Sequence, residues 1–199
     1  MNKTLYKTRP FLLTVIIILA DQLSKSFIAN TWPLENGIGG IFIRDVFNNG
    51  LLNIIHVRNN AIAFSLGHTL PDTLRLVLFI ALPLLVLGVL CVYYFKTEDL
   101  SRLQRWAFTG IIGGGIGNII DRVFRPDGVV DFISVKWFGL TFPNGKPVPL
   151  LNYERWPTFN IADSSVVVCG IILFLTIFFS TTIPLNLGES EKPQETADE

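Results

Sequence analysis

The sequence has little of the chemistry from which disulfides and metal sites are built. Its 199 residues include only two cysteines and two histidines. Cys91 and Cys169 lie inside long apolar runs, where a thiol behaves as a small and inert hydrophobic group. His56 and His68 have no second histidine or cysteine at the spacing of a metal site. We therefore expect no disulfide and no bound metal.

The chain also lacks an excess of charge of either sign. Sixteen basic residues balance sixteen acidic ones, so no basic field attracts nucleic acid, and we expect no nucleic-acid partner. Charged residues make up only 16% of the chain, hydrophobic residues make up 50%, and the mean hydropathy is +0.48. A composition this apolar indicates a membrane protein rather than a soluble domain.

Four stretches are long and apolar enough to cross a bilayer as helices of about 20 residues. They are residues 11–31, 74–95, 103–124 and 164–185. The first has the basic start of a signal peptide, but Asp21 and Lys25 follow its apolar part and no small-residue cleavage site is present. We therefore predict an all-α membrane protein with four transmembrane helices, the first of them retained.

Lysines and arginines mark the side of each connection. They are concentrated before residue 10 and in the short connection after the second helix, so we expect both termini in the cytoplasm. The connections 32–73 and 125–163 are then extracytoplasmic, and their β-branched and aromatic segments predict a small β-rich lobe. We expect one membrane domain over residues 1–187 and a disordered cytoplasmic tail over 188–199.

Polar residues interrupt the first and third predicted helices, and others lie in the connection that leads to the fourth. The predicted topology brings all of them to one face of the membrane. The group comprises Asp21, Gln22, Lys25, Asn118, Asp121, Arg122, Asp131, Asn160 and Asp163. Two carboxyl groups in a site of low dielectric constant share one proton, which leaves one acid and one base near neutral pH. The sequence therefore favours carboxylate chemistry at the outer surface of the membrane.

Each of these acids also has a purely structural explanation. Asp21 and Lys25 are one helical turn apart and can neutralise each other. Asp121 can anchor the third helix at the interface, and Asp163 can be the N-cap of the fourth helix. Asp131 can be an exposed strand residue. A proton-coupled transporter or a non-enzymatic scaffold is the alternative function, although transport favours acids spread through the depth of the membrane.

Glycines are concentrated in the third helix. They form two G-x-x-x-G pairs, Gly110 with Gly114 and Gly113 with Gly117. This spacing is typical of membrane helices that pack closely, so we expect the third helix to contact its neighbours through this face.

Five short segments stand out in chain order. They are DQLSK at 21–25, RNNAIAFS at 58–65, GGGIGNIIDR at 113–122, VVDFI at 129–133 and FNIADS at 159–164. Together they resemble the motif set of the prolipoprotein signal peptidases, also called signal peptidase II. The resemblance extends over nearly the whole chain, from the first predicted helix to the fourth.

This resemblance implies a membrane-embedded aspartic endopeptidase that removes signal peptides from bacterial prolipoproteins. It implies cleavage on the N-terminal side of a diacylglyceryl-modified cysteine, in the inner membrane at its extracytoplasmic face, without metal or organic cofactor. Asp131 and Asp163 would be the catalytic pair. The supporting residues would be Asp21, Lys25, Asn59, Asn118, Asp121, Arg122 and Asn160. Membrane lipids are the other expected partners, and we expect a monomer.

The chain departs from the family pattern at two places. Ala61 stands where the family has a glycine, which puts the local backbone conformation in doubt. The segment 136–156 is longer than usual and rich in aromatic residues and prolines. We interpret it either as a lid or cradle over the substrate lipid or as packing within the extracytoplasmic lobe.

Overall fold

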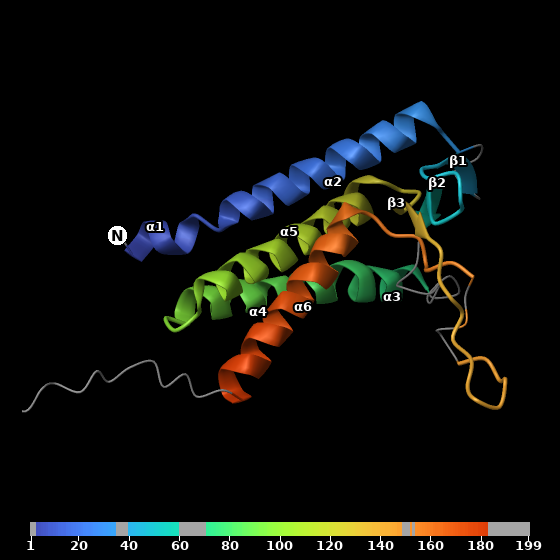
Figure 1. Ribbon diagram of the computed structural model, residues 1–199. Helices are drawn as coiled ribbons and strands as arrows, with labels where there is room; N and C mark the ends of the chain where they lie inside the picture. The colour runs from blue at the N-terminus through green and yellow to red at the C-terminus, as the bar shows by residue number, and fades with distance from the viewer. Residues whose placement is uncertain (1–2, 35–39, 60–70, 149–151, 153, 183–199) are drawn as a thin grey trace, which may run out of the picture.

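A bundle of long helices carries a small β-sheet at one end (Figure 1). The computed structural model describes residues 3–34, 40–59, 71–148, 152 and 154–182. Ala61 and the predicted tail 188–199 lie outside the described residues.

The helices lie where the sequence predicts them. A short helix α1 (Lys3–Thr8) precedes α2 (Phe11–Thr31). Helix α3 (Asp72–Leu76) continues through a π-helical turn, η3 (Val77–Ala81), into α4 (Leu82–Lys96). Helix α5 covers Arg102–Phe124, and α6 covers Ile161–Thr182. Helix α6 thus begins earlier than the predicted residue 164, because Asn160 caps it.

Among the described residues, three helical segments have the length and composition of membrane spans: Leu5–Thr31, Thr73–Lys96 and Ile161–Phe179. Their outward faces carry exposed apolar side chains such as Phe27, Leu85 and Phe174. Such surfaces suit contact with lipid. Helix α5 is not among the three, so the prediction of four spans is only partly confirmed.

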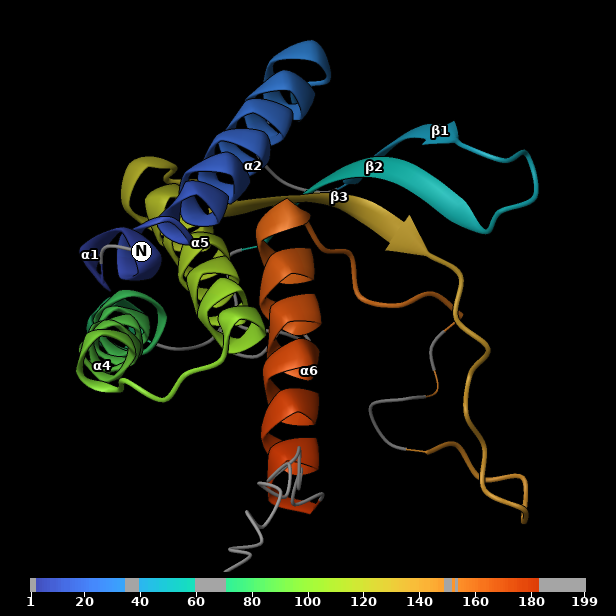
Figure 2. The ribbon, with the colours of Figure 1, turned by 60° about the vertical axis from the view of Figure 1, so that its left-hand side comes forward.

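Helix α5 lies at the centre and packs against α2, α4 and α6 (Figures 1 and 2). Its glycines permit this packing. A Cβ atom added to Gly114 would collide with the carbonyl oxygen of Ala162 and would lie 2.8 Å from Val166 Cγ2. A Cβ on Gly117 would lie 2.8 Å from Asp21 Oδ2. The predicted glycine face is therefore confirmed as the face that meets α6 and α2.

Replacing Gly114 with alanine should destabilise the bundle by about 1–3 kcal/mol, the usual cost of overpacking a closely packed interior. The matched control is Gly170→Ala in α6, where an added Cβ meets nothing within 4 Å. Thermal unfolding in detergent should give a lower melting temperature for Gly114→Ala and an unchanged or slightly higher one for Gly170→Ala. Equal melting temperatures would contradict the close contact between α5 and α6.

The sheet confirms the predicted β-rich lobe and consists of three antiparallel strands in the order β1-β2-β3. Strand β1 covers Gly40–Asp45, β2 covers Leu52–Asn59 and β3 covers Val129–Val135. Strand β3 packs against the end of α2, where Ile28, Val130 and Phe132 form a buried cluster. This packing fixes β3, and with it Asp131, at the end of the bundle.

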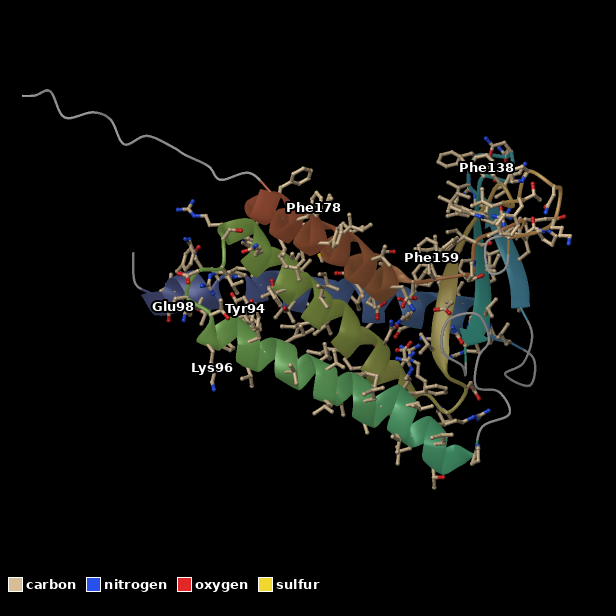
Figure 3. The ribbon with its side chains drawn as sticks, turned by 90° about the horizontal axis from the view of Figure 1, so that it is seen from below. Tyr94, Lys96, Glu98, Phe138, Phe159 and Phe178 are labelled. Atoms are coloured by element: carbon tan, nitrogen blue, oxygen red, sulfur yellow. The ribbon has the colours of Figure 1, made fainter. Side chains whose placement is uncertain are left out.

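The described ends of the aromatic segment 136–156 pack within the lobe. The rings of Trp137 and Trp156 lie 4.9 Å apart, and Arg155 donates hydrogen bonds to Ser134 Oγ at 2.7 Å and to Gly50 O at 2.8 Å. Phe138 is 86% exposed and lies at the far end of the lobe (Figure 3). The two ends of the segment, at Trp137 and Trp156, therefore contact each other.

Candidate active site

The sequence-predicted polar residues meet where the sheet joins the bundle. Phe159, which precedes α6, marks this junction in Figure 3. Five elements contribute: α2 from one side, the last turns of α5, the end of β2, the middle of β3 and the start of α6. Residues far apart in sequence are therefore brought to one place.

Asp131 is held in β3 by two asparagines. Val57 of β2 lies opposite Asp131 in the antiparallel register, so Asn59, two residues further on, lies on the same face of the sheet. Asn59 Nδ2 donates to Asp131 Oδ2 at 2.9 Å, and Asn160 Nδ2 donates to Asp131 Oδ1 at 2.8 Å. Asp131 is only 3% exposed, so the interpretation of an exposed strand residue is wrong.

Asp163 is held by a reciprocal pair of hydrogen bonds at the start of α6. The backbone N–H of Asp163 donates to Asn160 Oδ1 at 2.9 Å, and the backbone N–H of Asn160 donates to Asp163 Oδ2 at 3.2 Å. This is the arrangement of a capping box. Asn160, rather than Asp163, therefore caps the helix. The second oxygen, Asp163 Oδ1, accepts a hydrogen bond from Asn118 Nδ2 at 2.7 Å.

The orientation of the Asn118 amide is fixed by Lys25. Asn118 Oδ1 accepts from Lys25 Nζ at 3.0 Å and from Asn160 Nδ2 at 3.1 Å. An ammonium group can only donate, so the amide oxygen must face it and the amide nitrogen must face Asp163. One hydrogen-bonded chain thus connects Lys25 to both carboxyl groups of the candidate pair.

A buried ion cluster lies at the Lys25 end of this series of hydrogen bonds. Lys25 is fully buried and lies 2.8 Å from Asp21 Oδ2 and 3.1 Å from Asp121 Oδ2. Asp21 Oδ1 accepts from the backbone N–H of Ala162 at 2.9 Å, and Asp121 Oδ2 accepts from the backbone N–H of Val130 at 3.2 Å. These two amides directly precede Asp163 and Asp131. Each supporting aspartate therefore fixes the backbone beside one member of the candidate pair.

Two further residues complete the cluster. Arg125 was not predicted, and Gln22 belonged to the predicted polar group but not to the supporting residues. Arg125 Nε lies 3.3 Å from Asp121 Oδ1, and Arg125 Nη2 donates to Ser26 Oγ at 3.1 Å. Gln22 Nε2 lies 3.0 Å from the same Asp121 oxygen. The signals were present, since Gln22 interrupts an apolar helix and Arg125 follows Asp121 by one helical turn. With Lys25 and Arg125, the charges of Asp21 and Asp121 are balanced.

Asp131 and Asp163 line a cleft of about 490 Å³. Its other polar lining residues include Asn59, Asn118 and Arg122, and Trp156, Phe159, Val167 and Val168 contribute apolar surface. Val167 and Val168 are 58% and 55% exposed, so the cleft continues onto the outward face of α6. Within the described residues Arg122 makes no hydrogen bond or ion pair to another side chain, in contrast to Arg125.

The environment of Asp131 favours its protonated form. Burial raises the pKa of Asp131 to about 7, and the negative charge of Asp163 acts in the same direction. The hydrogen bonds from Asn59 and Asn160 lower this pKa and only partly offset the two effects. Near neutral pH the two carboxyl groups can therefore hold one proton between them.

Titration of Asp131 should show both effects. The C=O stretch of the protonated acid, identified by its loss in Asp131→Asn, should disappear in infrared spectra with a midpoint near pH 7. Asp163→Asn should move the midpoint to lower pH, because it removes one negative charge. The pKa of Asp131 in the folded protein exceeds its unfolded value of 3.8. The free energy of unfolding should therefore fall as the pH rises from 3.8 to about 7. An unchanged midpoint in Asp163→Asn would show that the two carboxyl groups are not coupled.

Comparison with known proteins identifies the family of this chain. The family model described as signal peptidase (SPase) II matches residues 13–179. A lipoprotein signal peptidase from Treponema denticola is 44% identical over 181 residues, which cover 91% of this chain and 95% of the relative. The corresponding protein of Treponema pallidum is 38% identical over 170 residues, covering 84% and 81% of the two chains.

Solved structures show the same fold. A bacterial membrane enzyme determined by the in meso method at 2.3 Å superimposes with a TM-score of 0.65 and 26% identity, covering 95% of this chain and 94% of its own. A second such enzyme, at 1.9 Å, gives a TM-score of 0.63 and 27% identity over 85% and 92% of the two chains. The chain therefore belongs to the signal peptidase II family, the membrane proteases that cleave prolipoprotein signal peptides.

Proposed function

We propose that this protein removes the signal peptide from diacylglyceryl-modified prolipoproteins, with Asp131 and Asp163 as its catalytic pair. The observation that carries the proposal is their position in one cleft, each carboxyl group held by two asparagine contacts. Lys25 and Arg125 balance the charges of the supporting cluster, whereas Asp131 and Asp163 form no ion pair with a described residue.

The proposed mechanism uses the pair as one acid and one base. The ionised carboxylate takes a proton from a water molecule as that water attacks the scissile carbonyl carbon. The protonated carboxyl group donates a hydrogen bond to the developing oxyanion and then gives its proton to the leaving nitrogen. The pKa of Asp131, raised to about 7, supports this division of roles near neutral pH.

The surroundings of the cleft suit a substrate that lies partly in the bilayer. Exposed apolar side chains of α6 adjoin the catalytic pair, so a signal peptide can approach laterally with its helix in lipid. Trp156 and Phe159 offer apolar contact for the diacylglyceryl group. Arg122 lines the same cleft and is placed to contact the substrate backbone or its ester carbonyls, both of which are hydrogen-bond acceptors.

The remaining proposals concern the placement of the chain. Helix α5 forms the fourth crossing at the centre of the bundle, both termini are cytoplasmic, and the sheet with the catalytic pair lies at the extracytoplasmic face of the inner membrane. The basic residues Lys7, Lys96 and Arg102 at the end opposite the sheet support this orientation. We expect residues 1–187 to act as one domain and as a monomer.

The test is conversion of a purified prolipoprotein by the purified full-length protein in lipid nanodiscs. A diacylated substrate should yield a fragment whose N-terminal residue is the lipidated cysteine, identified by mass spectrometry. The matched control is the same prolipoprotein before diacylation, which should remain intact. Equal cleavage of both forms would refute the requirement for the lipid, and cleavage of neither would refute the proposed activity.

A further inference from the structure

A second pocket lies at the end of the bundle opposite the sheet. Its volume is about 420 Å³, and its wall includes Tyr6, Arg9, Arg102, Arg105 and Trp106. Tyr94, Lys96 and Glu98 mark this end in Figure 3, far from Phe159 at the candidate active site. The catalytic proposal uses none of the residues in this pocket.

Arg105 carries the argument, because its guanidinium group is buried and only partly satisfied. The residue is 1% exposed, and its guanidinium carbon lies 5.0 Å from the ring centre of Tyr6 and 5.4 Å from that of Tyr94. Nη2 donates to the carbonyl oxygens of Thr97 and Glu98 at 3.2 and 2.9 Å. Nε and Nη1 have no hydrogen-bond partner among the described residues. Buried donors without acceptors are costly and call for a partner.

No acid in the described part of the chain neutralises this pocket. Arg9 and Arg102 are exposed at its rim, and neither makes an ion pair with a described residue. Glu98 lies 2.7 Å from Lys7, so its charge is already balanced. Asp99 is exposed and is not part of the pocket wall. The pocket therefore has a net positive charge and suits an anion.

The outer edge of the pocket is apolar and faces outward. Leu12 is 62% exposed and Trp106 is 41% exposed, and both belong to the pocket wall. Leu12 begins a row of exposed apolar residues on α2 that continues through Val15, Ile16 and Leu19. Tryptophan is typical of the boundary between lipid tails and headgroups. An occupant with an anionic group inside and apolar chains along α2 fits this combination.

We propose that this pocket binds the headgroup of an anionic phospholipid, with its phosphate between Arg9, Arg102 and Arg105 and its acyl chains along α2. Arginine suits this role because its planar donor group matches phosphate oxygens. Basic pockets at the ends of membrane helices bind such headgroups in other proteins. The inference depends on insertion of the protein in a membrane and not on the assignment of the catalytic pair.

The test compares phosphatidylglycerol with phosphatidylcholine, using the full-length protein in nanodiscs and native mass spectrometry to count retained lipids. Phosphatidylglycerol should be retained preferentially and should raise the melting temperature. The double variant Arg9→Gln/Arg102→Gln should weaken its binding by about fivefold for each arginine, or about 25-fold in total. Both arginines are exposed, so this variant leaves the fold intact where replacement of the buried Arg105 would not.

The matched control is Arg44→Gln/Lys146→Gln, which removes two exposed basic residues from the sheet end. It should bind phosphatidylglycerol as the unmodified protein does. Equal weakening in both double variants, or no preference for phosphatidylglycerol, would overturn the proposal. A further variant converts the acids of the C-terminal segment, Glu189, Glu191, Glu195, Asp198 and Glu199, to amides. If this variant and the arginine variant both lower the melting temperature in phosphatidylcholine, and by the same amount, the pocket holds that segment and the proposal is wrong.

Discussion

Asp131→Asn and Asp163→Asn should each reduce the rate of prolipoprotein cleavage by about 1,000-fold or more while the protein remains folded. Asparagine can neither accept the proton of the attacking water nor donate one to the leaving nitrogen, so loss of either carboxyl group removes one of the two roles. The measurement is the initial rate of conversion of a diacylated prolipoprotein by each purified variant.

Both variants should fold, because the side-chain oxygen of asparagine is still a hydrogen-bond acceptor at each position. In Asp163→Asn this oxygen can still accept from the backbone N–H of Asn160, as Asp163 Oδ2 does. The matched control is Asp127→Asn, which changes an exposed acid between α5 and β3 that does not line the cleft. Its rate should equal that of the unmodified protein. A folded Asp163→Asn protein with full activity would remove Asp163 from the mechanism.

Lys25→Met should be among the most damaging single substitutions for stability. It leaves Asp21 and Asp121 fully buried without the ammonium group that lies 2.8 and 3.1 Å from their oxygens. Removing one partner from a buried ion cluster costs about 3–5 kcal/mol, because Asp21 then has neither water nor a counterion and Asp121 keeps only Arg125. Thermal unfolding in detergent should therefore give a much lower melting temperature and a smaller folded fraction.

Two controls separate this effect from the loss of a lysine as such. Lys146→Met removes an exposed lysine and should leave the melting temperature unchanged. Adding Asp21→Asn to Lys25→Met should restore part of the stability, because it removes one of the buried charges left without a partner. If Lys25→Met and Lys146→Met melt at the same temperature, the buried cluster does not stabilise the fold.

The activity of any folded Lys25→Met protein should fall as well. Lys25 fixes the oxygen of the Asn118 amide, and its removal allows this amide to turn its oxygen toward Asp163. An oxygen facing a carboxylate is repulsive, whereas the nitrogen is attractive. The ion cluster thus links the stability of the bundle to the orientation of a group in the cleft.

Much of the fold was predictable because its signals are local. Long apolar runs fix where α2, α4 and α6 lie, whatever the rest of the chain does. The glycine spacing in α5 indicated a packing face, and the contacts of Gly114 and Gly117 confirm it. The role of α5 was harder to predict by composition, because a central helix contacts other helices rather than lipid and so need not be strongly apolar.

The details of the site depended on contacts that no local pattern encodes. Asp163 in a favoured capping position suggested an N-cap, but Asn160 takes that role and leaves one oxygen of Asp163 to Asn118. The sequence allowed Asp121 to be an anchor of the third helix at the interface, yet Asp121 is buried against Lys25 and Arg125, while Arg122 lines the cleft. Adjacent residues on a helix point in different directions, so Asp121 meets the buried cluster while Arg122 meets the cleft.

The sequence by itself determined that this is a membrane protein, where its helices lie, and which acids gather at one end, because hydropathy and motif order are properties of the chain alone. Only the tertiary structure decided what surrounds each of those acids. Asp21 and Asp121 meet cations and backbone amides inside the bundle, whereas Asp131 and Asp163 face a cleft. The physical reason is that burial and charge balance arise from α2, α5, α6 and the sheet together, and these elements are adjacent only in the folded protein.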